Sequence, residues 1–248
     1  MTMLAVILAA GQGTRLLPLT ADTPKCLIDV GGQPILGRML DALTAAGVER
    51  AIVVTGHRSE QVDAYLASRG GTPQVATVRN DLYATTNNAA SLAAAHGAIG
   101  GDAFLLCDAD VIFSESPLPA LLAAPEPCSL VVDRGAALAH EEMKVQIDRH
   151  GLIARLSKRL DPADCAGESI GVQKLGGPHL ARVWDEVDAV VRTDAATAYY
   201  EDVFQRLIDG GMRFGTSDVA TKSWMEIDSA ADLETARRRF GRVVTRQG

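Results

Sequence analysis

Glycines and positively charged side chains are gathered in one short stretch near the start of the chain, residues 8–25. Gly11 and Gly13 follow a buried apolar run, and Arg15 and Lys25 lie in the same polar turn. Glycines let a backbone approach a ligand closely and direct several N–H groups toward it, while an arginine and a lysine neutralise negative charge. This combination predicts a loop that binds phosphate groups.

Two familiar phosphate-binding loops do not account for this stretch. A dinucleotide-binding fingerprint needs a third glycine where the chain has Leu16, which disfavours a nicotinamide-dependent dehydrogenase. A Walker-type loop ends in Gly-Lys-Ser or Gly-Lys-Thr, and the chain contains neither triplet. A bare Gly-x-Gly would be read as an ordinary strand-to-helix turn with two solvated cations. The whole combination instead favours a phosphate loop of another type.

Two pairs of acidic residues, each with one residue between them, end apolar strand-like segments. The pairs are Asp108 with Asp110 and Glu226 with Asp228. Residues two apart on an extended strand share a face and are separated by about 6.6 Å. That separation is wide for two ligands of one Mg²⁺ at ~2.1 Å, so we expect one acid of the first pair to bind metal directly and the other to lie behind it. Without the loop, solvated carboxylates at a strand end are an equally good interpretation, and Asp228 could belong to a helix N-cap.

Amide and hydroxyl side chains form a third cluster. A side-chain amide offers a donor and an acceptor together, which suits a nucleobase edge or substrate hydroxyls. Taken alone, the cluster would be interpreted as an Asx-rich turn. Its polar members, with one tyrosine among them, are Asn80, Tyr83, Thr85, Thr86, Asn87, Asn88 and Ser91.

The elements that must position these residues alternate between strand and helix in the first half of the chain. The expected strands are residues 4–8, 51–55, 74–78 and 104–107, and the expected helices are residues 35–47, 59–66 (capped by Ser59) and 89–96. This alternation predicts an α/β fold with a doubly wound, mostly parallel, Rossmann-like sheet. Ligands bind such sheets beyond the carboxyl ends of the strands, so we expect residues 8–15 and 108–110 on one edge.

Shorter strands follow in the second half. The expected strands are residues 129–132, 143–147, 152–156, 170–175 and 223–227, and the expected helices are residues 180–191, 195–208 and one opened by the capping pattern Ser229-x-x-Asp232. The His150-Gly151 turn predicts a small antiparallel β insertion. We expect a single domain over residues 1–248, with a nucleotide-binding half of about 1–125 and an acceptor-binding half of about 126–248 that completes the metal site.

Composition excludes several classes of protein. A net charge of −7 argues against a nucleic-acid surface and against binding to anionic lipid. Apolar residues make up 47% of the 248 residues, so the chain is not disordered. The cysteines lie far apart, which favours reduced thiols over a zinc or redox site. No basic-plus-apolar leader and no apolar run of ~20 residues occurs, so we expect a soluble cytoplasmic protein without a membrane partner.

A longer pattern over residues 8–27 resembles the signature of nucleotidyltransferases that activate sugar phosphates and phosphocholine, a family with the MobA-like fold. Its two parts are Gly11-Gln12-Gly13-Thr14-Arg15-Leu16-Leu17-Pro18-Leu19-Thr20 and Thr23-Pro24-Lys25-Cys26-Leu27. The branch of phosphocholine and phosphonate cytidylyltransferases is similar over nearly the whole chain, with residues 112–140 the weakest part. The further matching stretches are Asn80-Asp81, Asn87-Asn88-x-x-Ser91-Leu92, Met143-Lys144-Val145, Ser157-Lys158, Gly167-Glu168-x-x-Gly171 and Tyr200-x-Asp202.

The resemblance implies a Mg²⁺-dependent cytidylyltransferase that transfers CMP from CTP to a small phosphorylated alcohol, amine or phosphonate and releases pyrophosphate. It implies catalytic roles for Arg15, Lys25 and Lys158, and metal binding by Asp110, Asp228 and Glu226. It implies nucleotide contacts from Leu8, Ala9, Ala10, Gly11, Gly13, Thr14, Asn80, Thr85, Thr86, Asn87 and Asp108. Acceptor contacts are implied for Tyr83, Asn88, Ser91, Glu168, Tyr200, Glu201 and Asp202. The sequence is compatible with a homodimer and does not determine the oligomeric state.

The acceptor is left open by the residues themselves. Choline-activating members of the branch commonly carry an aromatic residue where this chain has Ala89-Ala90, and a quaternary ammonium is usually held by an aromatic cage. A primary amine held by Glu201 or Asp202, or a polyol, fits at least as well. Two other functions remain: a sugar-1-phosphate nucleotidyltransferase, and a nucleotide-sensing domain without catalysis.

Overall fold

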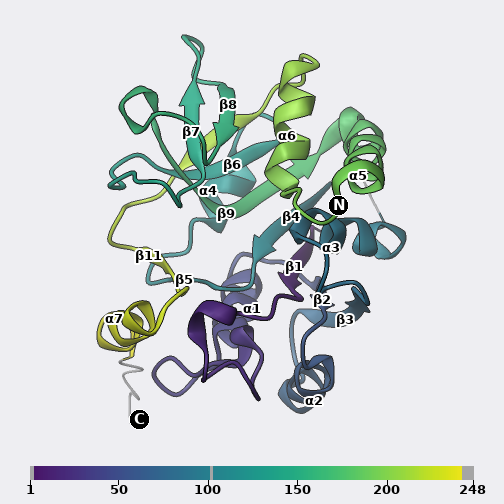
Figure 1. Cartoon of the computed structure of the whole chain (residues 1–248), viewed down its shortest axis with the longest axis vertical. Helices are drawn as coiled ribbons and strands as arrows, with labels where there is room; N and C mark the ends of the chain where they lie inside the picture. Colours follow the sequence, from purple (N-terminus) through teal and green to yellow (C-terminus); the bar gives the residue numbers. More distant parts are fainter. Residues whose placement is uncertain (1–2, 101–102, 242–248) are drawn as a thin grey trace.

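A nine-stranded mixed sheet forms the centre of the protein, as seen in a computed structural model that describes residues 3–100 and 103–241 (Figure 1). Seven strands follow the order β10-β6-β9-β4-β1-β2-β3, and β7 and β8 branch from β9. The strands are β1 (Leu4–Ala9), β2 (Arg50–Thr55), β3 (Gln74–Arg79), β4 (Ala103–Asp108), β6 (Ser129–Asp133), β7 (Lys144–Ile147), β8 (Ile153–Ser157), β9 (Gly167–Gly176) and β10 (Gly215–Asp218).

The four strands of the first half are parallel to one another. β1 pairs with β2 on one side and β4 on the other, and β2 pairs with β3. The side chains of β1 are almost all buried, because both faces of this part of the sheet are covered, and such strands read as continuous apolar runs. The prediction of a doubly wound, mostly parallel α/β sheet is therefore confirmed.

Helices cover both faces of the sheet. On one face α3 (Asn88–Ala95), α5 (Leu180–Asp194) and α6 (Tyr200–Asp209) pack on side chains such as Val6 and Leu106. On the other face α1 (Ile35–Ala45), α2 (Ser59–Arg69) and α4 (Leu118–Ala123) contribute to a second core with Ile7 and Cys107. Alternate residues of one strand thus enter different cores, as the period of two requires.

The carboxyl ends of β1 and β4 are where the strand order reverses, because β2 follows β1 on one side and β4 lies on the other. Leu8 and Asp108 are register partners at this edge. Connections to helices leave the sheet in opposite directions at such a point and open a crevice for ligands. The expected meeting of residues 8–15 with residues 108–110 is found here.

The second half adds the expected antiparallel insertion. β7 and β8 form a hairpin around a turn in which Gly151 has a φ of 79°. β9 is antiparallel to its neighbours β4 and β6, and joins the hairpin to the main sheet. β5 (Val111–Phe113) and β11 (Trp224–Glu226) form a separate two-stranded ribbon beside α7 (Ala230–Phe240). The sequence patterns did not predict β5, β10 or α4.

Two local predictions are wrong. Ser59 does not cap α2, because the N-cap position is Arg58, and the Ser59 hydroxyl instead accepts a hydrogen bond from Arg79. α6 begins at Tyr200, five residues later than expected, because the preceding connection bonds to α3: the backbone N–H of Asn87 donates to the carbonyl of Ala195. No helix within the described residues has the length and apolar character that a membrane crossing requires.

Candidate active site

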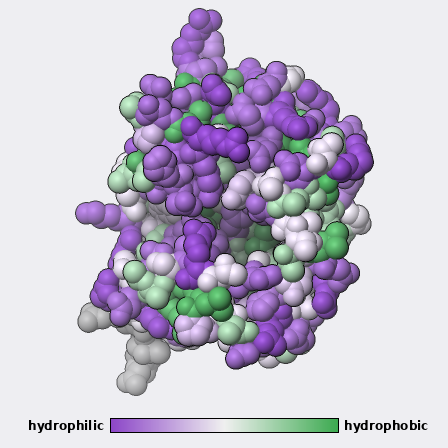
Figure 2. Space-filling model, in the orientation of Figure 1, coloured by the Kyte–Doolittle hydropathy of each residue, from purple (hydrophilic) through white to green (hydrophobic). Residues whose placement is uncertain are grey.

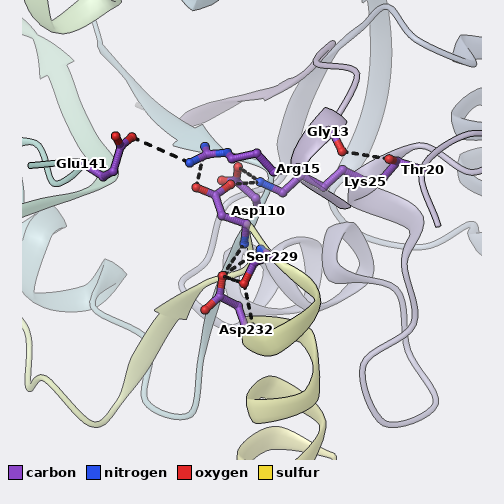
Figure 3. A network of polar contacts seen from close by, with 9 residues as sticks. Gly13, Arg15, Thr20, Lys25, Asp110, Glu141, Ser229 and Asp232 are labelled. Carbon is purple, nitrogen blue, oxygen red and sulfur yellow. Dashed lines mark hydrogen bonds and ion pairs between the residues drawn. The ribbon is translucent and has the colours of Figure 1, made fainter. Parts of the chain in front are cut away.

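The loop after β1 is folded so that its two cations face the sheet edge. Gly13 has a φ of 62°, and a Cβ there would lie 3.0 Å from the Thr20 side chain and 3.1 Å from that of Lys25. Thr20 Oγ1 donates to the carbonyl of Gly13 over 2.8 Å, which fixes the bend (Figure 3). Only glycine adopts this conformation without strain and also leaves room for Lys25.

Lys25 lies between two carboxylates. Its Nζ is 2.6 Å from Asp110 Oδ2 and 2.5 Å from Asp228 Oδ1, and Arg15 reaches the other oxygen of Asp228 at 2.6 Å (Figure 3). Burial alone would lower the pKa of Lys25, but Asp110 and Asp228 together hold the pKa well above its ordinary value. The ammonium group is therefore a fixed positive charge at the end of the sheet.

Asp110 and Asp228 come from opposite ends of the chain, and the β5–β11 ribbon brings them together. Glu226 is the register partner of Val111, the residue after Asp110, and the backbone N–H of Ile227 donates to the carbonyl of Asp110 over 3.1 Å. α7 begins directly after this point. Its start is fixed by a capping box in which Ser229 and Asp232 bond to each other's backbone, as the sequence pattern predicted (Figure 3).

Three carboxylates form a group that fits a divalent cation. Asp110, Glu226 and Asp228 each place one oxygen within 4.8 Å of the others. Hard cations such as Mg²⁺ prefer this donor set of a few carboxylate oxygens completed by phosphate and water. Burial and the two neighbouring aspartates raise the pKa of Glu226 to about 9, so without a cation this third carboxyl keeps its proton at neutral pH, while Lys25 and Arg15 balance the two aspartates. A bound divalent cation would favour the ionised form of Glu226 and so lower this pKa.

Asp108 is held apart from this group. The hydroxyl of Tyr200 donates to Asp108 Oδ2 over 2.8 Å. Gly171, with a φ of 74°, packs so closely that a Cβ there would lie 2.4 Å from the same oxygen. Burial, Asp110 and Glu201 raise the pKa of Asp108 well above its ordinary value. Of the acids two residues apart, Asp110 joins the carboxylate group and Asp108 does not.

A pocket of about 390 Å³ extends from these charges along the sheet edge, a size typical of small-ligand sites. Figure 2 shows the face hollowed near its middle, with hydrophilic residues above the hollow and on its left and less polar residues on its right. The start of α3 contributes one wall, through Asn87, Asn88 and Ser91. Asn87 is the N-cap of α3, and Asn88 Oδ1 accepts from the backbone N–H of Tyr200 over 2.9 Å, which ties α3 to α6.

The second half of the chain contributes a further part of the wall. Lys158 follows β8 and places its Nζ 5.2 Å from the centre of the Tyr199 ring. Glu201, on the first turn of α6, is only 6% exposed, and its Oε2 makes no hydrogen bond within the described residues. Burial raises the pKa of Glu201 to about 7 and that of Glu168 to about 7, with Lys158 opposing the rise in both.

The structure brings most of the predicted site residues into this pocket. Those that line it are Leu8, Ala9, Ala10, Gly11, Gly13, Thr14, Arg15, Lys25, Tyr83, Thr86, Asn87, Asn88, Ser91, Asp108, Asp110, Lys158, Glu168, Glu201, Glu226 and Asp228. Their places are consistent with the predicted roles, which themselves stay predictions.

Four predicted site residues lie outside the lining. Asn80 is buried and donates to Ser91 Oγ over 3.1 Å, so it supports the wall from behind. Thr85 is exposed and bonds to the carbonyl of Leu82. Tyr200 is completely buried beneath Asp108. Asp202 is exposed and caps α6 by accepting from the backbone N–H of Tyr199 over 2.8 Å.

Several lining residues were not predicted to be part of the site. Ser169 lies inside the Gly-Glu-x-x-Gly motif and Tyr199 precedes Tyr200, so both were close to recognised patterns. Glu141 carried no signal. It lies between β6 and β7, directly after the stretch of weakest resemblance (residues 112–140), and approaches Arg15 to 3.9 Å across the mouth of the pocket (Figure 3).

Comparison with known proteins assigns the family. The MobA-like NTP transferase domain matches residues 5–150. The chain belongs to this family. A 2-aminoethylphosphonate cytidylyltransferase of Lancefieldella rimae is 32% identical over 92% of this chain and 89% of its own length. A CMP-5'-(3-aminopropyl)phosphonate synthase of Streptomyces rubellomurinus is 31% identical over 95% of this chain, which spans 38% of that longer protein.

A solved structure supports the same fold for this NTP transferase. The CTP:phosphocholine cytidylyltransferase of Streptococcus pneumoniae superposes with a TM-score of 0.81, covering 97% of this chain and 100% of that one at 24% identity. The predicted membership of the nucleotidyltransferase family, and the similarity to its cytidylyltransferases, are thus confirmed.

Proposed function

We propose that this NTP transferase is a cytidylyltransferase that transfers CMP from CTP to a small phosphonate- or phosphate-bearing acceptor and releases pyrophosphate. The observation that carries the proposal is the group formed by Arg15, Lys25, Asp110 and Asp228 at the reversal of strand order. The Lancefieldella rimae relative, similar over nearly the whole length of both chains, is the reason for naming cytidine and a phosphonate-type acceptor.

In this proposal the acceptor oxygen attacks the α-phosphorus of CTP and the bond to pyrophosphate breaks. Such a displacement requires alignment and neutralisation of charge rather than a protein nucleophile. Arg15 and Lys25 bind the triphosphate, and Lys158, which lines the same pocket from the second half of the chain, binds the acceptor phosphonate. To reach phosphate oxygens, the two cations of the loop exchange part of their contact with Asp228.

Asp110, Glu226 and Asp228 are proposed to hold Mg²⁺, and their oxygens within 4.8 Å of one another support this assignment. The metal would supply positive charge to the phosphate oxygens in the displacement. Residues 1–125 then contribute the nucleotide side of the site. Residues 126–248 contribute the acceptor side, and they also supply Glu226 and Asp228 to the proposed metal site.

A screen of pyrophosphate release tests the proposal. Each of the four nucleoside triphosphates is combined with 2-aminoethylphosphonate, phosphocholine, phosphoethanolamine and hexose 1-phosphates, with and without Mg²⁺. We expect release with CTP and a phosphonate or phosphocholine-like acceptor, dependent on Mg²⁺. Release with a hexose 1-phosphate alone would replace the proposal by a sugar-phosphate nucleotidyltransferase. Tight CTP binding without release would indicate a nucleotide sensor.

A further inference from the structure

Two buried polar groups in the wall of the pocket lack a hydrogen-bond partner among the residues that the structure describes. Glu201 and Ser169 are each 6% exposed, and both line the pocket. Neither Glu201 Oε2 nor Ser169 Oγ makes a hydrogen bond within the described residues. The groups come from different elements, α6 and β9, so a single local irregularity does not explain them.

Buried polar groups of this kind destabilise the folded protein unless a ligand forms hydrogen bonds with them. A buried polar atom without a hydrogen bond destabilises a protein by about 1–3 kcal/mol, and more when it is charged. An ionised carboxylate only accepts hydrogen bonds, whereas a hydroxyl both accepts and donates. A ligand that satisfies both groups must therefore offer a donor to Glu201, and either a second donor or an acceptor to Ser169. A positively charged donor makes the stronger, charge-assisted bond to Glu201.

The charged side chains around Glu201 also indicate a ligand that carries both a positive and a negative group. Lys158 is close enough to lower the pKa of both Glu201 and Glu168, yet it lies in no ion pair within the described part of the chain and instead faces the Tyr199 ring. The wall thus presents a cation beside two carboxyl groups. An acceptor with an anionic phosphonate at one end and an ammonium at the other matches this order of charges.

The aromatic side chains argue against a quaternary ammonium. Among the described residues that line the pocket, Tyr83 and Tyr199 are the aromatic ones. Lys158 already lies over the Tyr199 ring, 5.2 Å from its centre. A trimethylammonium group has no N–H to donate and is ordinarily held by several aromatic faces. It would leave Glu201 Oε2 and Ser169 Oγ without partners.

We propose that the acceptor carries a primary ammonium group, and that Glu201 and Ser169 bind it and discriminate against trimethylammonium. This inference rests on the proposed cytidylyl transfer and specifies its acceptor. The ammonium donates to Glu201 Oε2 and to Ser169 Oγ, while Lys158 neutralises the phosphonate. Glu201 is a specificity residue that touches the acceptor and does not take part in bond making.

The test uses three acceptors that differ only in the head group. These are 2-aminoethylphosphonate, its N,N,N-trimethyl derivative and 2-hydroxyethylphosphonate, each with CTP and Mg²⁺ in the pyrophosphate assay. For the wild type we expect kcat/KM for the amine to exceed that for both others by roughly 10- to 100-fold, as for one charge-assisted bond. In Glu201→Gln the amine should lose this advantage through a higher KM, while kcat/KM for the hydroxyl acceptor changes by less than about threefold.

Two further variants sharpen the result. Ser169→Ala should raise KM for the amine by a smaller factor, roughly 3- to 10-fold, as for a neutral hydrogen bond. Asp209→Asn, an exposed carboxyl at the far end of α6, is the matched control and should leave all three values unchanged. Equal turnover of amine and trimethylammonium by the wild type would overturn the inference. So would an equal loss for all three acceptors in Glu201→Gln, or a loss confined to KM for CTP.

The two proposals fail in different ways. If no acceptor in the broader panel gives pyrophosphate with any triphosphate, the proposed function is refuted and the inference with it. If cytidylyl transfer occurs but shows no preference for the amine, only the inference is refuted. Loss of the preference in Glu201→Gln, with transfer to the hydroxyl acceptor retained, supports both.

Discussion

Glu201→Gln should make the ligand-free protein more stable than the wild type at alkaline pH. The ordinary pKa of this carboxyl, 4.5, applies to the unfolded chain, whereas burial raises it to about 7 in the folded protein. Between these values the folded protein keeps a proton that the unfolded chain releases. Wild-type stability therefore falls as pH rises through this window and stays lower above it. The full effect corresponds to about 3 kcal/mol, and glutamine removes it.

Urea unfolding at pH 5 and pH 8, without ligands, measures the effect. The free energy of unfolding of Glu201→Gln minus that of the wild type should increase by about 2–3 kcal/mol between the two pH values. Glu60→Gln, which removes an exposed carboxyl of α2, is the control for the loss of one negative charge. An unchanged difference would refute the reasoning, because it would show that folding does not take the Glu201 carboxylate away from water.

Three other substitutions test the charged centre and the packing beneath it. Lys25→Ala should lower kcat/KM by about 10- to 150-fold, as for a lost charge-assisted contact of 1.5–3 kcal/mol, and unchanged pyrophosphate release would contradict its role. Asp110→Asn should abolish Mg²⁺-dependent turnover, whereas activity with an unaltered Mg²⁺ titration would refute the metal site. Gly171→Ala should destabilise the protein by about 2–4 kcal/mol in urea unfolding, because the new Cβ would meet Asp108 at 2.4 Å. Gly151→Ala, with a similar φ but open space, should lose only about 1 kcal/mol, and equal losses would contradict the packing argument.

The parallel half of the sheet could be predicted because its strands carry their own signal. Buried strands such as β1 and β4 are continuous apolar runs; β4 ends at Asp108, and β1 ends at Ala9, two residues before Gly11. β5 has only three residues, Val111–Phe113, and lacks a period long enough to recognise. Its pairing with β11 depends on a contact between residues more than a hundred positions apart, which no local pattern encodes.

For the candidate site, the sequence predicted the types of residue more reliably than the directions in which their side chains point. Asn80 has the amide expected of a base-reading residue, but its side chain turns inward to Ser91. The helix expected at α6 began at residue 195, so residues 199–202 were expected within the helix and not at its start. With the helix starting at Tyr200, that ring points into the core, Asp202 caps the backbone, and Glu201 between them faces the pocket. Side-chain direction near a helix start depends on where the first turn begins, and the sequence pattern did not locate that point.

The β5–β11 ribbon also determines which parts of the protein can vary independently. Trp224 is the register partner of Phe113, so the chain leaves the charged centre after Phe113 and returns to it at Trp224. Residues 114–223 therefore form one excursion from this centre. A change confined to the loops of that excursion leaves the spacing of Asp110 and Asp228 in place, because the ribbon and the contacts of both carboxylates with Lys25 fix it. The acceptor specificity of such an enzyme could thus change during evolution through substitutions in the excursion, while the residues of the charged centre stayed the same. Recombining the excursion between relatives is the corresponding route in the laboratory.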